Sequence, residues 1–218
     1  MKKIVSFCLW GNDPRYTVGA LKNADLAKEI YPDWICRYYI GKSTPNEIIT
    51  ELCDKDNTEL FIMNESGDWR GMFWRFLPAS DSDVSVMISR DTDSRLSQRE
   101  KEAVDQWLDS DRGFHIMRDH PAHGTEILGG MWGAKIGSIP EMKPLIADYS
   151  KGDFWQVDQN FLKEKIYPIV KTNSFVHDEF FEPNGNSFPR KRKEGIDSNG
   201  NPIDFIGEPV DQNDKRIW

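Results

Sequence analysis

The sequence predicts an α/β fold, a single domain built as a three-layer α/β/α sandwich around a mainly parallel central sheet. Three observations support this fold class. Short apolar or β-branched runs alternate with segments of helical periodicity over the first half of the chain. The length of 218 residues suits one α/β domain with a cleft and is too short for two catalytic domains. Hydrophobic residues make up 38% and charged residues 29%, which argues against disorder and against a fibrous protein.

Four strands and three helices are expected in the first ninety or so residues. Strands are predicted at 3–9, 34–40, 60–63 and 84–88, and helices at 17–30, 46–54 and 69–77. Pro32 ends the first helix and Pro78 the third. Thr44 or Ser43 caps the second helix, which has Pro45 at its first position. Because strands and helices alternate, we expect the strands to pair in parallel.

The second half of the chain is less regular. A helix is expected from Ser97 to Trp107 or Leu108, and Ser97 and Glu100 match a capping box. A strand is predicted at 114–118, a second helix at 155–165 and a strand-like run at 167–172. Glycine is dense among bulky residues at 128–137, which indicates close approach of the backbone to other groups. The last forty or so residues have weak periodicity.

Charge, cysteine content and hydropathy exclude several classes of protein. The formal net charge of −8 disfavours a nucleic-acid-binding protein, because a phosphate backbone requires a basic face. Cys8, Cys36 and Cys53 form no metal-type pair and are expected to be reduced packing thiols. No stretch of about twenty apolar residues exists, so no transmembrane segment is predicted. The apolar run at 4–10 is too short for a signal peptide, and we expect a cytoplasmic protein.

The triplet Asp91-Thr92-Asp93 follows the continuous apolar run at 84–88. Such a run is typical of a strand buried on both faces, so the two carboxylates would face the crevice at the strand ends. Acids at positions i and i+2 can share one hard cation, Mg²⁺ or Mn²⁺, which would bridge them to a substrate diphosphate. Arg90 and Arg95 flank the triplet and could extend a phosphate site. The alternative is a solvated surface turn, because Asp-x-Asp also occurs by chance.

Four segments of the chain, taken in order, resemble glycosyltransferases of the GT-A fold. These segments are 89–94 (Ser-Arg-Asp-Thr-Asp-Ser), 127–133 (Ile-Leu-Gly-Gly-Met-Trp-Gly), 155–162 (Trp-Gln-Val-Asp-Gln-Asn-Phe-Leu) and 176–178 (Val-His-Asp). The resemblance implies a metal-dependent enzyme that moves a sugar from a nucleotide-diphosphate donor to a glycan or other hydroxyl acceptor. It further implies one catalytic domain over 1–218, with a nucleotide-binding half at 1–95, a donor-sugar and acceptor half at 96–180 and an irregular C-terminal segment at 181–218.

The resemblance implies a metal site on the acidic triplet. Asp91, Thr92 and Asp93 would bind the cation and the nucleotide-sugar, with Asp93 as the direct ligand. His177 looks like the late histidine that completes the metal shell in some of these enzymes, and an imidazole ligand would favour Mn²⁺ over Mg²⁺. A surface or core histidine is the alternative. The chain lacks the glycine and lysine context that follows this histidine in the family.

The resemblance also implies residues around the donor sugar. Gly129 and Gly130 would let the sugar approach the backbone, with Trp132 as a stacking wall, unless they form only a tight bend. Asp158 and Gln159 would open a helix beside the sugar. If the enzyme inverts the anomeric centre, Asp158 is the candidate base for the acceptor proton. If it retains the configuration, Asp158 or Gln159 would orient the donor.

The nucleotide, of the UDP or GDP type, is expected at the end of the first strand. There Phe7 and Trp10 would contact the base and ribose, although strand packing explains Phe7 equally well. Arg75 resembles the basic residue that faces the donor, and Arg90 would lie at the phosphates. Arg118 is a further candidate for phosphate or acceptor. Solvated surface arginines are the alternative.

Two rival functions remain open. A metal-dependent phosphohydrolase also places two aspartates after a strand, but no downstream lysine and acidic pair is evident here. A carbohydrate-binding protein could use the eight tryptophans, but such modules are usually rich in strands. The spacing of His115, His120 and His123 matches no zinc pattern. The basic loop at 189–193 is either a solvated connection or a lid over the diphosphate.

Overall fold

A computed structural model describes residues 1–152 and 154–217. A seven-stranded sheet has the order β3-β2-β1-β4-β6-β5-β7. Its strands are β1 (Lys2–Leu9), β2 (Ile35–Ile40), β3 (Thr58–Ile62), β4 (Val84–Ser89), β5 (Phe114–Arg118), β6 (Trp132–Lys135) and β7 (Ser174–Asp178). Every pairing is parallel except those of β6, which runs antiparallel to β4 and β5. The predicted α/β fold with a mainly parallel sheet is confirmed.

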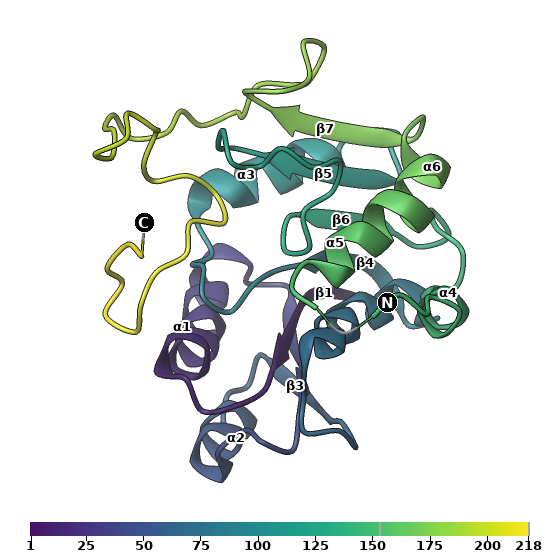
Figure 1. Ribbon diagram of the computed structural model, residues 1–218, viewed down its shortest axis with the longest axis vertical. Coiled ribbons are helices and arrows are strands. Elements are labelled where there is room, and N and C mark those ends of the chain that lie inside the picture. Colours follow the sequence, from purple (N-terminus) through teal and green to yellow (C-terminus); the bar gives the residue numbers. More distant parts are fainter. Residues whose placement is uncertain (153, 218) are drawn as a thin grey trace.

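Helices cover both faces of the sheet (Figure 1). They are α1 (Pro14–Ile30), α2 (Asn46–Cys53), α3 (Gln98–Leu108), α4 (Met142–Ala147), α5 (Val157–Phe161) and α6 (Tyr167–Val170), with the 3₁₀ segment η1 (Trp69–Ser80) and the π-helical segment η2 (Leu162–Ile166). None of the described helices is long and apolar enough to cross a membrane.

Each face of the sheet has its own hydrophobic core, because successive side chains of a strand point to opposite faces. On one face Ile4 packs in a cluster that includes Phe76 of η1 and residues of α5. On the other face Val5 packs in a cluster with Ala24 of α1 and Trp107 of α3. The result is the expected three-layer arrangement, and it leaves the carboxyl ends of β1 and β4 open for a site.

Three helical segments of the first half differ from the prediction in their start, their cap or their end. α1 begins at Pro14, three residues before the expected start, because the Asp13 side chain accepts a hydrogen bond from the Arg15 amide and caps it. The predicted cap of α2 is wrong, since Pro45 itself is the N-cap residue and no side chain caps that helix. η1 continues through Pro78 to Ser80 rather than ending at the proline.

The second half contains two strands and one helix that were not predicted, β6, β7 and α4, and one helix, α6, in place of a predicted strand. The capping role of Ser97 is confirmed, since its hydroxyl accepts a hydrogen bond from the Glu100 amide. The glycine-dense segment includes β6, whose four residues are too few to show a period. The strand expected at 167–172 is wrong: Tyr167–Val170 is α6, and the strand that pairs with β5 is Ser174–Asp178.

Candidate active site

A cleft of about 900 Å³ lies at the carboxyl ends of β1 and β4, and it collects most of the residues that the sequence singled out. Strand β1 pairs with β2 on one side and with β4 on the other. The strands that follow β1 are therefore added first to one side of it and then to the other, and the order of the strands reverses at this point. Open α/β sheets bind ligands at such a crevice. The expected site residues that line the cleft are Trp10, Arg75, Asp91, Thr92, Asp93, Gly129, Gly130, Asp158 and Gln159.

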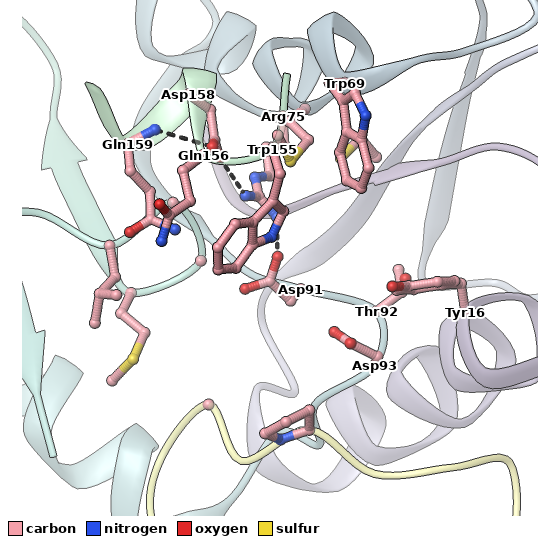
Figure 2. Close-up of a pocket in the computed structure, with 18 of the residues that line it drawn as sticks. Tyr16, Trp69, Arg75, Asp91, Thr92, Asp93, Trp155, Gln156, Asp158 and Gln159 are labelled. Carbon is pink, nitrogen blue, oxygen red and sulfur yellow. Dashed lines mark hydrogen bonds and ion pairs between the residues drawn. The ribbon is translucent and has the colours of Figure 1, made fainter. Parts of the chain in front are cut away.

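Arg75 connects two carboxylates on the floor of this cleft (Figure 2). Its Nη2 donates to Oδ2 of Asp158 at 2.8 Å, and its Nη1 forms a short ion pair with Asp91. The side chains of Arg75 and Asp158 are 5% and 2% exposed. Burial raises the pKa of Asp158, and the Arg75 charge opposes that effect. Because an unpaired buried charge is costly, the buried pair of Arg75 and Asp158 is expensive to break, whereas the Asp91 side chain is 42% exposed.

Gly129 and Gly130 provide the space that this cluster occupies. A Cβ atom on Gly129 would lie less than 3.0 Å from Asp158 Oδ2 and from Arg75 Nη2. A Cβ atom on Gly130 would lie less than 3.0 Å from Oδ2 of Asp91. The Gly129 carbonyl accepts a 2.7 Å hydrogen bond from the Ser89 hydroxyl, which fixes the segment against the end of β4. The two glycines are therefore required by charged side chains of the protein itself.

Asp93 differs from Asp91 in having no described ion-pair partner within 4.0 Å. Burial, followed by the negative charge of Asp91, raises its pKa to about 6. Its backbone is held on one side by the C-terminal segment, where the Val210 amide donates to the Asp93 carbonyl at 2.8 Å. Thr92 is buried beneath it, and Gly19 of α1 lies directly against the Thr92 carbonyl. The triplet is thus a rigid turn that presents an unneutralised carboxylate.

The pair Asp91 and Asp93 fits one kind of metal site. Among the described residues, no group of three or more histidine, cysteine or acidic side chains is arranged to hold a metal ion. Mg²⁺ and Mn²⁺ are commonly bound by only one or two carboxylates, with substrate phosphates completing the shell. Burial and, after it, the negative charge of Asp91 raise the pKa of Asp93, and a bound cation would oppose the repulsion between the two acids. The residues present fit a site in which a divalent cation is bound by protein carboxylates together with substrate phosphates. They do not fit a site in which the protein supplies every ligand.

His177 does not reach this site. It lies within β7, fully buried, and is not among the residues that line the cleft. Its Nδ1 is 2.8 Å from Nε2 of His115, and its Nε2 is 2.9 Å from Oε1 of Gln106. Burial, followed by the charge of Arg99, lowers the pKa of His177 to about 4. The expectation of a metal-ligating histidine gives way to the alternative, a core histidine with both nitrogens engaged.

Three other expected contacts also lie outside the cleft. Trp132, expected as a stacking wall for the sugar, is fully buried and stacks on Phe114 in the core. Phe7 is buried and stacks on Tyr38 with ring centroids 4.9 Å apart, so its role is strand packing. Arg90 is buried and donates to Glu100 at 2.7 Å, which places it within the domain interior. Phe7 belongs to the core on one face of the sheet, and the buried ion pair of Arg90 with Glu100 holds the Arg90 side chain away from the cleft.

The remaining basic candidates are held by acids elsewhere in the protein. Arg118 forms a short ion pair with Asp178 and lies beneath the segment that follows β7. In the basic loop, Arg190 pairs with Glu102 and Arg192 pairs with Asp119. This loop is therefore fastened to α3 and to the segment after β5, and it contributes no lining residue to the cleft.

Several lining residues were not predicted. Tyr16, Trp69, Trp155 and Gln156 stand around the cleft in Figure 2, and Trp155 is 66% exposed. His123 and the C-terminal residues Gly207 and Pro209 also line it. An exposed tryptophan is a recognisable signal only when the fold is known. The C-terminal segment has no periodicity, so the sequence did not predict that it would contact Asp93.

The sequence matches no family model and no curated protein. Solved structures do match the fold. One is a glycosyltransferase involved in the glycosylation of the major capsid of PBCV-1, with a TM-score of 0.54, 13% identity and 82% of each chain covered. The protein has a GT-A-type fold. Another match is TarS 1-349 from S. aureus, with a TM-score of 0.52 and 10% identity, covering 82% of this chain and 58% of that one. At these identities the GT-A-type likeness concerns the fold.

Proposed function

We propose that this protein is a metal-dependent glycosyltransferase that moves a sugar from a nucleotide-diphosphate donor to a hydroxyl acceptor. The observation that carries the proposal is the position of Asp91 and Asp93 at the carboxyl end of β4, in the crevice beside β1 of a GT-A-type fold. There an unneutralised carboxylate, Asp93, faces open space beside a neutralised one. A divalent cation bound together with the phosphates of a donor would balance the charge of these two acids.

The nucleotide half of the donor is assigned to the β1 side of the cleft. Trp10, Asn12 and Asp13 follow β1 directly, and Tyr16 follows on the first turn of α1. Aromatic rings and short polar side chains at a strand end suit a base and a ribose. We expect a UDP- or GDP-type nucleotide, with its diphosphate directed toward Asp93.

Mn²⁺ or Mg²⁺, when bound, would act as a Lewis acid that neutralises charge on the leaving diphosphate. Asp93 would be the principal protein ligand, because its carboxylate, unlike that of Asp91, forms no ion pair among the described residues. Asp91 contributes its charge while Arg75 fixes its orientation. The turn formed by Asp91, Thr92 and Asp93 would therefore hold the two acids at a constant spacing before the donor binds.

The surroundings of Asp158 favour an orienting role over that of a general base. Its Oδ2 accepts from Arg75, and its Oδ1 accepts from the Gln159 amide at 2.9 Å. With the side chain 2% exposed, an acceptor hydroxyl has little access to either oxygen. We propose that Asp158 holds Arg75 in place and that Gln159, on the first turn of α5, contacts the donor sugar.

The same contacts weigh against the two rival functions. A phosphohydrolase that used Asp91 as its nucleophile would have to release the ion pair between Asp91 and Arg75 first. A carbohydrate-binding module has no use for buried charged residues beneath its binding surface. The Arg75 cluster, built at a cost in desolvation, indicates chemistry on a charged substrate.

The first experiment is a thermal-shift screen with UDP-, GDP-, dTDP- and CMP-sugars, each with and without Mn²⁺. A ligand that binds only the native state raises the melting temperature by mass action. We expect a metal-dependent shift with one nucleotide class in the wild type and none in Asp93→Asn. The proposal fails if no nucleotide-sugar produces a shift, or if the shift in Asp93→Asn equals that of the wild type.

A further inference from the structure

We infer that residues 122–125, the loop after β5, form the acceptor wall of the cleft, where His123 donates a hydrogen bond through Nε2 to an uncharged hydroxyl of a saccharide. This inference rests on the proposed function and names the acceptor side of the same site. Ala122, His123, Gly124 and Thr125 all line the cleft.

His123 is held so that one nitrogen serves the fold and the other faces the cleft. The side chain is 6% exposed, and Nδ1 accepts a 3.0 Å hydrogen bond from the Asp119 amide. A neutral imidazole whose Nδ1 is an acceptor carries its proton on Nε2. Within the described part of the chain no group accepts a hydrogen bond from Nε2, and this nitrogen is not completely shielded from solvent. The Nε2–H group therefore meets the open cleft.

The surroundings of His123 determine the kind of atom it can bind. The rings of His120 and Phe205 pack against it, with centroids 5.8 Å and 5.4 Å away. Burial, followed by the neighbouring His120, lowers the pKa of His123 to about 3. It is consequently a neutral donor at every physiological pH. A phosphate oxygen favours a cationic partner, whereas a sugar hydroxyl is matched by a neutral N–H group.

The topology places this loop one sugar beyond the diphosphate. Strand β6 lies between β4 and β5, and neighbouring strands are roughly 4.8 Å apart. The end of β5 is therefore about 10 Å across the sheet from the end of β4, where Asp93 follows. A pyranose ring fits in that interval. His123 lies in the loop that follows β5, so a group that it binds lies on the side of the cleft away from Asp93, where an acceptor can reach the donor sugar.

The α5 side of the cleft independently favours a saccharide. Trp155 presents an indole that is 66% exposed, and Figure 2 shows it at the cleft with Gln156. Gln156 has φ of 70°, a left-handed conformation that is unfavourable for a residue with a side chain. Strain of this kind is concentrated at ligand sites. An exposed aromatic face and an amide suit the apolar face and the hydroxyls of a sugar ring.

Two substitutions separate binding from structure. His123→Asn keeps an acceptor near the Nδ1 position for the Asp119 amide but removes the donor at Nε2. His123→Gln places its amide nitrogen near Nε2 and removes the Nδ1 acceptor. We would measure binding of the wild type and both variants to a glycan array, with Mn²⁺ and the nucleoside diphosphate identified by the thermal-shift screen. Melting temperatures would confirm that both variants fold.

We expect His123→Asn to bind the recognised saccharide about five- to tenfold more weakly, with nucleotide binding unchanged and with recovery in His123→Gln. The inference is overturned if His123→Asn binds like the wild type, or if His123→Gln is the weaker variant, since either result assigns His123 a structural role. Binding of the nucleotide without any glycan overturns the acceptor assignment alone. Absence of nucleotide binding as well would instead remove the proposed function.

Discussion

Nη2 of Arg75 donates a 2.8 Å hydrogen bond to Oδ2 of Asp158, joining η1 to the start of α5 across 83 residues of sequence. The same guanidinium pairs with Asp91 at the end of β4. Three elements that meet at the cleft are thus connected by one side chain. Arg75 and Asp158 are buried whereas the Asp91 side chain is 42% exposed, so the Arg75–Asp158 pair is the part of this connection that is most costly to break.

Replacement of Arg75 by lysine should disrupt both stability and donor binding. A lysine ammonium cannot reproduce the two planar contacts of a guanidinium, so one carboxylate loses its partner. Breaking a buried ion pair costs about 3–5 kcal/mol when a charge is left unpaired. Differential scanning calorimetry should show a clearly lower melting temperature for Arg75→Lys. Arg112→Lys, on an arginine whose side chain is 46% exposed, is the matched control and should melt like the wild type.

Gly130→Ala should abolish nucleotide-sugar binding. The new Cβ atom would lie less than 3.0 Å from Oδ2 of Asp91, so the carboxylate must move and break its ion pair with Arg75. Gly124→Ala, where the nearest atoms are 3.7 Å away on Phe181, is the packing control and should keep the wild-type melting temperature. Isothermal titration with the donor tests the prediction. If Gly130→Ala kept the donor affinity of the wild type, the observed position of the Asp91 carboxylate would not be required for donor binding.

Asp93→Asn should be more stable than the wild type at neutral pH in the absence of divalent metal. The native pKa of about 6 exceeds the unfolded value near 3.9, so the native state binds the proton more tightly. The stabilising contribution of Asp93 is fully present below about pH 4 and is lost as the pH rises through about 6. Asparagine does not titrate and avoids that loss.

The expected gain in Asp93→Asn at pH 7.5 is on the order of 1 kcal/mol, or about 2–4 °C, because partial exposure weakens the effect. At pH 4 the two proteins should melt together. Thermal unfolding at both pH values with a chelator present provides the measurement. A constant difference between the two pH values would contradict the raised pKa.

Mn²⁺ binding should weaken as the pH falls below about 6. The cation needs the ionised carboxylate of Asp93, and a proton competes for it in that range. Titration of Mn²⁺ in the presence of the nucleoside diphosphate, followed by electron paramagnetic resonance, should show affinity rising between about pH 5 and pH 7. A flat profile would indicate that Asp93 is not the ligand.

Asp158→Asn should reduce donor affinity as well as turnover. The carboxylate serves Arg75, so its loss disturbs the donor site before any chemistry occurs. Steady-state kinetics together with direct donor binding would separate the two effects. If turnover falls at least a hundredfold while donor affinity is unchanged, Asp158 is the general base after all.

Much of the site could be predicted from the sequence because its parts are local. Asp91 and Asp93 stand two residues apart after a continuous apolar strand, and that arrangement requires no knowledge of distant residues. Asp158 and Gln159 likewise lie together on the first turn of a helix. The structure brings all four to one cleft, as the resemblance to GT-A enzymes implied.

The predictions that the structure contradicts concern residues whose contact partners are distant in the chain. Whether His177 reaches a metal depends on which strand it joins, and pairing of β7 with β5 buries it beside His115. The four residues of β6 carry no readable period, so its antiparallel insertion was missed. In the sequence, His123 could be assessed only by comparing the spacing of the neighbouring histidines with zinc-binding patterns. Its position in the cleft depends on how the loop after β5 folds back.

The sequence by itself determined the alternation of strands and helices, the apolar strand that ends in two acids and the absence of a long apolar helix, because periodicity and composition are local properties. Only the tertiary structure decided that Arg75 joins Asp91 to Asp158, that two glycines make room for them and that the C-terminal segment returns to Asp93. These contacts arise from packing between segments far apart in the chain, and local propensities carry no information about which distant surfaces will meet.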